Sequence, residues 1–269
     1  MNQWIIEKNY FDEKDQEQII DCIMNPMTSA TRREPDTYLI SEYSPIHKYN
    51  MIDKNHPVMS LGSIEFIKNI QLYDFKPGTW CNFEDFKCTN YYPQISHDLL
   101  NEHHIMMKAE DLNILFDETL SAFNGVMHIR PNASDKPFPG FVTTNRDKWD
   151  RYSRLVFPDD LVIVSPFQKI KTEIRCFVTK TRISECSIYK ENNEITFRRV
   201  KLDSVYDFVF SILPKLNMVD PIFTIDIATT DDVNWKVLEL NSFSCSGFYS
   251  CAISHIMKHA STALRINDK

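Results

Sequence analysis

Glycine is scarce in this chain, with only five among 269 residues, and no GxxxxGK[ST] segment occurs. The second absence excludes a P-loop of the Walker type. No apolar run approaches the ~18 to 20 residues that a membrane-spanning helix requires. The N-terminus has no basic segment followed by an apolar one, so we expect no signal peptide. These absences together indicate a cytoplasmic protein without a membrane partner.

Paired cysteines are also missing, because the seven cysteines are odd in number and none lies in a CxxC segment. Reduced thiols in a cytoplasmic protein are therefore expected. The net charge of −7 argues against a non-specific nucleic-acid coat, although an acidic chain can still carry a local basic patch. Two runs are candidates for such a patch, with a solvated helix face as the alternative for the first: Arg146, Lys148, Arg151 and Arg154, and Arg198, Arg199 and Lys201.

The composition that remains is ordinary for a globular protein, 43% hydrophobic and 25% charged. It supplies a core for one large domain or two modest ones. Up to about residue 100 the chain reads as irregular, apart from a short strand at 4–7 and a helix capped by Asp12. An aromatic cluster in this part, Trp80, Phe83, Phe86, Tyr91 and Tyr92, is interpreted as core, with base stacking as the alternative.

The rest of the chain has clearer periodicity. Helical spacing predicts a helix at 111–123 capped by Asp111, a second one from Asp203, and a third at 248–264. Strands and helices mix without strict βαβ alternation, so the predicted fold class is α+β. Strands are predicted at 126–130, 161–164, 170–178, 183–189, 222–228 and 235–240.

The first segment with chemical character is HIRPNASDKPFPG at 128–140. A strand ends near Arg130, and a turn-rich loop follows that carries Lys136. A guanidinium binds two oxygens at once and an ammonium acts as a mobile point charge, so the pair suits a polyphosphate. A surface loop with solvated charges is the alternative.

The second segment is SPFQKIKTEIRCF at 165–177. If it is one strand, Lys169, Lys171, Glu173 and Arg175 all lie on one face. Four charges in a row are costly to bury without partners. We therefore expect this face to meet either solvent or a polar cleft.

Two strands near the C-terminus carry isolated oxygen ligands. Asp226 lies inside the apolar strand TIDIA, and carboxylates are seldom buried unless they are paired or bind a metal. Glu239 and Asn241 are two residues apart and hence lie on one face of the next strand. Carboxylate and amide oxygens match magnesium, which prefers few protein ligands together with phosphates and waters. A strand with one solvated polar face is the alternative.

In this order the segments resemble the ATP-grasp fold, and closely resemble a phage-enriched clade of ATP-grasp ligase-like proteins. The resemblance is carried by HIRPNASDKPFPG, SPFQKIKTEIRCF and ELNSFSCSGFY, and it extends upstream through GSIEFIKN, KPGTWCNFEDF and YYPQISHDLLNE. It thus covers most of the chain. The combination is specific, although each piece alone is not. Two departures are an arginine at Arg130, where many members have lysine, and a phosphate-covering loop that is not glycine-rich.

The resemblance implies roles for particular residues. Arg130 and Lys136 would contact the ATP phosphates, and the backbone of 162–165, including Val164 and Ser165, would read the adenine edge. Lys171 would also bind the nucleotide. The implied catalytic residues are Arg175, Lys136 and Glu173, and the implied ligands of Mg²⁺ are Asp226, Glu239 and Asn241.

The resemblance also implies an organisation and three classes of function. Residues 1–105 would form an N-terminal substrate-side lobe and 106–269 the ATP-grasp domain, with a small lobe at about 106–165 and a metal-binding lobe at about 166–269. The first class is a Mg-ATP-dependent carboxylate–amine ligase. The second is an RNA-end ligase, for which RNA binding would weaken steeply with salt. The third is a non-catalytic ATP-binding chaperone, and the fold alone does not decide among them.

Overall fold

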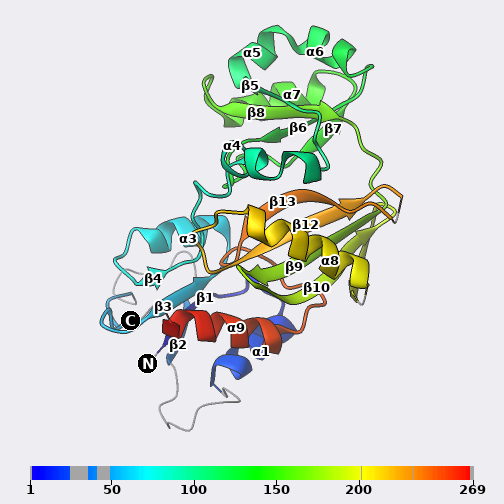
Figure 1. The fold of residues 1–269 in the computed structure, drawn as a ribbon. Coiled ribbons are helices and arrows are strands. Elements are labelled where there is room, and N and C mark those ends of the chain that lie inside the picture. The colour runs from blue at the N-terminus through cyan, green and yellow to red at the C-terminus, as the bar shows by residue number, and fades with distance from the viewer. Residues whose placement is uncertain (1, 25–35, 41–48, 201, 232, 267–269) are drawn as a thin grey trace.

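The structure is a computed structural model, and it describes residues 2–24, 36–40, 49–200, 202–231 and 233–266. Within these residues, three β-sheets follow one another along the chain and stack from bottom to top in the ribbon view (Figure 1). The predicted α+β class is confirmed. Lys201, one of the residues in the second basic run, lies outside the described residues.

The N-terminal sheet is parallel, with strand order β2-β1-β3-β4. Its strands are β1 (Gln3–Glu7), β2 (Asp36–Ile40), β3 (Val58–Leu61) and β4 (Pro77–Gly78). The prediction of an irregular N-terminal part was wrong. These strands have two to five residues, and β1 and β3 are buried along their whole length, so they lack the alternation by which a half-exposed strand is recognised.

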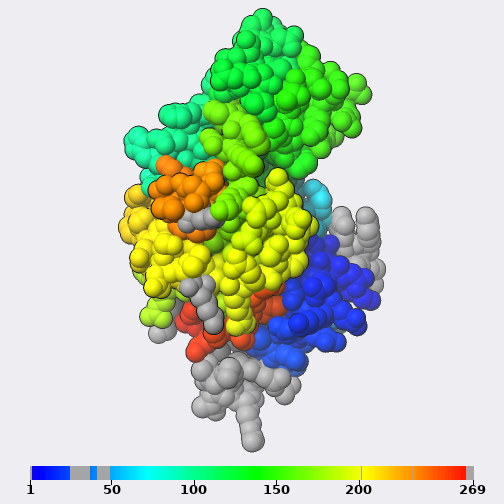
Figure 2. Space-filling model, turned by 90° about the vertical axis from the view of Figure 1, so that its right-hand side faces the viewer, coloured from blue at the N-terminus to red at the C-terminus, as the bar shows by residue number. Residues whose placement is uncertain are grey.

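The middle sheet is antiparallel, with strand order β5-β8-β6-β7. Its strands are β5 (Ile105–Lys108), β6 (Met127–Pro131), β7 (Phe141–Thr143) and β8 (Leu161–Pro166). Together with α5, α6 and α7 it forms the upper lobe in both views (Figures 1 and 2). The loop of residues 132–140, between β6 and β7, is the segment predicted to cover phosphates.

The third sheet is antiparallel, with strand order β11-β10-β9-β12-β13. One face carries Ile174, Cys176, Ile225 and Ile227, which pack with α8 in one core cluster. The opposite face carries the polar residues of the same strands, since side chains alternate along a strand. The bounds are β9 Thr172–Thr179, β10 Arg182–Glu191, β11 Glu194–Arg199, β12 Ile222–Thr229 and β13 Lys236–Ser242.

The helices confirm some predicted boundaries and correct others. The helix predicted at 111–123 is two helices that meet at Leu115, and the first begins at Ala109 rather than at Asp111. The last helix begins at Ile253, because the segment from Phe248 forms turns. The bounds are α1 Glu13–Met24, α3 Ile64–Gln71, α4 Cys88–Tyr91, α5 Ala109–Ile114, α6 Phe116–Ala122, α7 Asp147–Tyr152, α8 Asp203–Ile212 and α9 Ile253–Ile266.

The last helix joins the two ends of the chain. Ile256 and Leu264 of α9 share a core cluster with Trp4 of β1 and Ile19 of α1. In the ribbon view α9 and α1 lie together below the third sheet (Figure 1). The lobe boundaries near 105 and 165 stay predictions, and α9 crosses the first of them. No helix among the described residues is long and apolar enough to span a membrane.

Candidate active site

A cleft of about 420 Å³ lies between the middle and third sheets. Its volume is within the range of small-molecule sites. Two segments of the upper lobe line it, the end of β6 with the following loop and the chain just after β8; the opposite wall comes from β9, β10 and β13. The polar lining residues are His128, Arg130, Lys136, Gln168, Lys169, Glu173, Tyr189, Lys190, Asn193 and Glu239.

Glu239 lies at the centre of the charges on this wall. Its Oε1 accepts from Lys136 Nζ at 2.9 Å, and its Oε2 accepts from Arg130 Nη2 at 3.1 Å. Burial opposes its charged form, yet Lys136 and Arg130 outweigh that effect and hold the pKa of Glu239 well below its usual value. Glu239 is therefore a carboxylate at neutral pH and is 18% exposed to the cleft.

Asp226 lies next to Glu239, since the two are cross-strand partners in β12 and β13. Arg175 binds it as a fork, with Nε to Oδ1 at 2.8 Å and Nη2 to Oδ2 at 2.7 Å. Burial raises the pKa of Asp226, and Arg175 opposes that rise. Asn241 Nδ2 donates to both carboxylates, at 3.1 Å to Asp226 and 3.0 Å to Glu239. These contacts place three cations beside two carboxylates, which leaves one positive charge in excess.

Two β-bulges shape the cleft wall. The register between β12 and β13 shifts after Asp226, so that Leu238 has no direct partner, and the Leu238 carbonyl accepts from Arg130 Nη1 at 3.2 Å. A similar shift in β10 leaves Tyr189 between paired residues, and its hydroxyl donates to Glu173 Oε2 at 2.8 Å. Bulges of this kind re-aim side chains at the edges of functional sites. No sequence pattern indicated either of them.

The loop of residues 132–140 is attached on two sides. Ser134 Oγ donates to the Phe83 carbonyl at 2.8 Å, and Asp135 pairs with Lys68 of α3 at 2.7 Å. Lys136, at the next position, has a positive φ of 49° and reaches Glu239 instead. The loop therefore connects the N-terminal part of the molecule to the third sheet at the point where the cleft ends.

The predicted nucleotide residues lie in different places. Arg130, Lys136 and Glu173 line the cleft. Lys171 is exposed and is not among the lining residues, because β9 begins only at Thr172; the prediction of four charges on one strand face was wrong. Val164 is buried and paired with both β5 and β6, and Ser165 faces His128 of β6. The missed lining residues nearby are Phe167, Gln168, Lys169 and Ile170.

The imidazole of His128 is a further lining group that sequence reasoning did not select. Burial, with a smaller contribution from Arg130, lowers the pKa of His128 to about 4. It is therefore neutral at pH 7. Its Nδ1 lies 3.5 Å from Ser165 Oγ. No spacing in the sequence distinguished it from an ordinary strand histidine.

The predicted basic runs are interleaved with acids. Arg146 pairs with Asp150 at 3.4 Å, and Arg198 pairs with Glu191 at 2.8 Å. Arg151 Nε donates to the Asp147 carbonyl. Such local pairing weakens the field that a nucleic-acid groove requires.

The predicted magnesium ligands differ in how well they fit the ion. Among the described residues there is no group of three or more His, Cys, Asp or Glu side chains that would hold a metal. Glu239 faces the cleft and fits the role of a magnesium ligand, whereas both Asp226 oxygens already accept from Arg175. Asn241 presents its nitrogen to the carboxylates, so its oxygen becomes a ligand only if the amide turns over. The set fits a magnesium ion that takes its other ligands from phosphates and water.

A family model described as an ATP-grasp domain, family 2 of its clade, matches residues 112–259, more than half of the chain. The chain belongs to the ATP-grasp domain family. The match begins in α5 and ends in α9, and so it contains both sheets that line the cleft. No curated protein sequence matches the chain significantly.

Solved ATP-grasp ligases share the fold of the whole chain. D-alanine–D-alanine ligase from Bacillus anthracis complexed with ATP superposes with a TM-score of 0.60 at 16% identity, covering 99% of this chain and 98% of the other. D-cycloserine synthetase DcsG gives 0.62 at 10% identity, with 99% and 100% covered. The ATP-grasp ligase PsnB, complexed with minimal precursor, Mg and ADP, gives 0.54 at 13% identity, with 99% and 98% covered. The ATP-grasp fold therefore includes the N-terminal sheet, beyond the segment that the family model matches.

Proposed function

We propose that this protein is a Mg-ATP-dependent ligase that activates a carboxylate and joins it to an amine. The observation that carries the proposal is the position of Glu239, which is held by Lys136 and Arg130 on the wall of a cleft of about 420 Å³ between two sheets. The family and the ligases that share the fold support it. An RNA-end ligase, an ATP-binding chaperone and a phage origin stay predictions from the resemblance.

In this proposal the phosphates of ATP replace Glu239 as the partners of Lys136 and Arg130. Glu239 and Asn241, next to Asp226, would hold Mg²⁺, which would neutralise phosphate charge. Phosphoryl transfer depends chiefly on positioning and charge neutralisation, and the cations supply both. The adenine would meet the chain at 167–170 rather than the backbone of Val164, which is paired with strands on both sides.

The reaction proposed has two steps. A carboxylate oxygen of the acceptor forms a bond to the γ-phosphorus, the bond from that phosphorus to the bridging oxygen breaks, and ADP leaves. The amine then attacks the acyl carbon, the carbon–oxygen bond to phosphate breaks, and the amine loses a proton. Arg175 would lie near the transferred group, since it lines the pocket next to Lys136. We propose Glu173 as a positioning residue for Tyr189 and Lys190, which it contacts.

The test is calorimetric binding of ATP with and without magnesium, on the wild type and on Glu239→Gln. We expect magnesium to strengthen binding to the wild type and this gain to fall about tenfold or more in the variant, because the amide removes the ligand charge. Glu118→Gln, which removes an exposed carboxylate of α6, is the matched control. Absence of ATP binding in the wild type would contradict the nucleotide site, and a wild-type magnesium effect in Glu239→Gln would contradict the metal assignment.

A further inference from the structure

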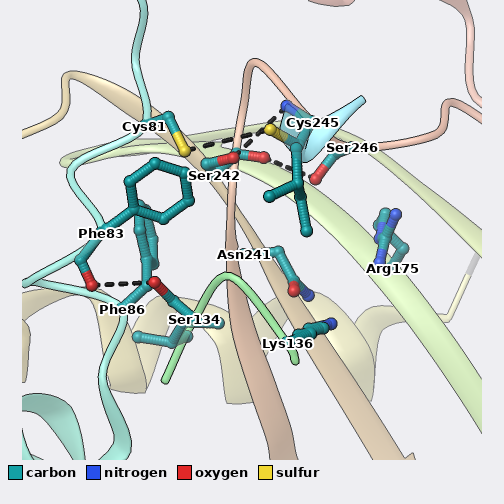
Figure 3. A pocket seen from close by; sticks show the side chains of 12 residues that line it. Cys81, Phe83, Phe86, Ser134, Lys136, Arg175, Asn241, Ser242, Cys245 and Ser246 are labelled. Atoms are coloured by element: carbon teal, nitrogen blue, oxygen red, sulfur yellow. Dashed lines mark hydrogen bonds between the residues drawn. The ribbon is translucent and has the colours of Figure 1, made fainter. Parts of the chain in front are cut away.

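A second, smaller pocket of about 90 Å³ lies beyond Lys136 (Figure 3). Lys136 lines both this pocket and the larger cleft. The small pocket is bounded by the start of α3, the chain after β4, the loop of residues 132–140 and the end of β13. It therefore lies where an acceptor would meet the end of the phosphate chain.

The two ends of this pocket differ in chemistry. One end presents Lys136, Arg175 and the amide of Asn241, which the close-up shows together below and beside the pocket (Figure 3). The other end is closed by Phe83, Phe86, Ile64 and Leu240, with the thiols of Cys81 and Cys245. No acidic side chain is among the described residues that line it. An anionic head with a short apolar tail matches this distribution.

Serine hydroxyls line the remaining wall. Ser134 Oγ donates to the Phe83 carbonyl at 2.8 Å, and Ser246 Oγ donates to the Ser242 carbonyl at 2.6 Å. Each hydroxyl proton is thus engaged, while the oxygen lone pairs are able to accept. A neutral hydroxyl on the ligand finds an acceptor here. An ammonium group would meet the same oxygens, but it would also lie near two cations without a carboxylate in the lining.

The volume limits the occupant. An apolar cavity of roughly 150 Å³ accommodates benzene, with its six carbons. A pocket of about 90 Å³ accordingly holds about four non-hydrogen atoms, which is a carboxylate with one or two further carbons. A nucleotide is several times larger than this. The size of the pocket therefore favours a small acid over an RNA end.

We propose that this pocket binds the acceptor as a short-chain carboxylate of two or three carbons that is unsubstituted or 2-hydroxylated, in preference to a 2-amino acid. The proposal rests on the function proposed above and specifies its substrate. The carboxylate faces Lys136 and Asn241, and the tail packs against Phe83 and Phe86. In this pose a carboxylate oxygen lies on the side of Lys136 that faces the nucleotide cleft.

The experiment measures binding without turnover, by saturation-transfer NMR of propionate, lactate, alanine and valerate on the full chain, with and without a non-hydrolysable ATP analogue. We expect propionate and lactate to bind at least about tenfold more tightly than alanine and valerate. Ile64→Phe narrows the pocket at the first residue of α3 and should weaken propionate about tenfold. Ile114→Phe, at a 75% exposed position of α5, is the matched control.

A gain of function completes the test. Phe83 is only partly buried, so Phe83→Ala should fold and should admit valerate, reversing its rank against propionate. The proposal is overturned if alanine or a 5′-phosphorylated trinucleotide binds better than propionate, or if Ile64→Phe leaves propionate binding unchanged. Analogue binding is followed separately by calorimetry. Its loss alone would overturn the nucleotide function, whereas carboxylate binding that follows the pocket variants would still support this assignment.

Discussion

At the scale of single residues, the charged groups of the site divide into two kinds. Glu239 is partly exposed and its partners, Lys136 and Arg130, can turn toward a ligand. Asp226 is 1% exposed and is fixed by the Arg175 fork, while Arg175 itself lies 5.0 Å from the ring centre of Tyr249. A buried pair of this geometry holds its two strands in register. The first kind suits ligand exchange, and the second suits a rigid support for it.

Removing Asp226 should therefore affect stability as well as activity. Asp226→Asn leaves the Arg175 guanidinium buried without its counter-charge, a change that costs about 3–5 kcal/mol. Urea denaturation followed by circular dichroism would measure the loss. Glu118→Gln serves again as a surface control, with an expected change within about 0.5 kcal/mol. A variant as stable as the wild type would show that Arg175 does not depend on this partner.

A second residue-scale prediction concerns Asp220. Burial raises the pKa of Asp220 to about 6, although the amide of Asn82 donates to its Oδ2 at 3.0 Å. The folded state thus binds this proton more tightly than the unfolded state, so this group lowers the free energy of unfolding as pH rises from about 4 to 6. The shift corresponds to about 3 kcal/mol.

Asp220→Asn removes this titration and keeps an oxygen acceptor for Asn82. We expect the variant to be more stable than the wild type at pH 7 by up to about 3 kcal/mol, and about equally stable at pH 4. Chemical denaturation at both pH values measures the difference. Equal stability of the two proteins at pH 7 would show that Asp220 is not perturbed.

At the scale of elements, the loop of residues 132–140 connects parts that are distant in sequence. It contacts α3 through Asp135, the segment after β4 through Ser134, and β13 through Lys136. Because Lys136 belongs to both pockets, the position of this loop determines both the nucleotide cleft and the acceptor pocket. Its attachment to α3 should therefore affect ATP binding from a distance.

Asp135→Asn tests this attachment. Lys68 and Asp135 are 39% and 35% exposed, so their ion pair contributes at most about 1 kcal/mol. We expect ATP affinity to fall by up to about fivefold, with the fold unaffected. Asp159→Asn removes an exposed pair with Lys108 on the upper lobe and should leave affinity unchanged. If both variants bind ATP as the wild type does, the attachment has no role in binding.

At the scale of the whole molecule, the two ends of the chain share one core. Ile256 of α9 is fully buried among residues of β1, α1 and the third sheet. A core shared in this way couples the unfolding of the N-terminal sheet to that of the C-terminal one. The body below the upper lobe should then unfold as one cooperative unit.

Ile256→Ala should cost about 2–5 kcal/mol, because it leaves a cavity in this shared core. Differential scanning calorimetry should show the whole transition of the body shifted to lower temperature, rather than a separate early transition. Ile195→Ala, at a 77% exposed position of β11, should have little effect. An early transition confined to part of the body would contradict the coupling.

The sequence by itself determined the fold family and the two strands that carry the polar face. The motif HIRPNASDKPFPG and the spacing of Asp226, Glu239 and Asn241 were sufficient, because alternation along a strand is a local property. Tertiary structure alone decided the partners: that Asp226 belongs to Arg175 and Glu239 to Lys136 and Arg130. It also decided the bulges at Leu238 and Tyr189, the parallel N-terminal sheet and the small pocket. Each of these depends on which distant segments pack together, and neighbouring residues in the sequence carry no record of that packing.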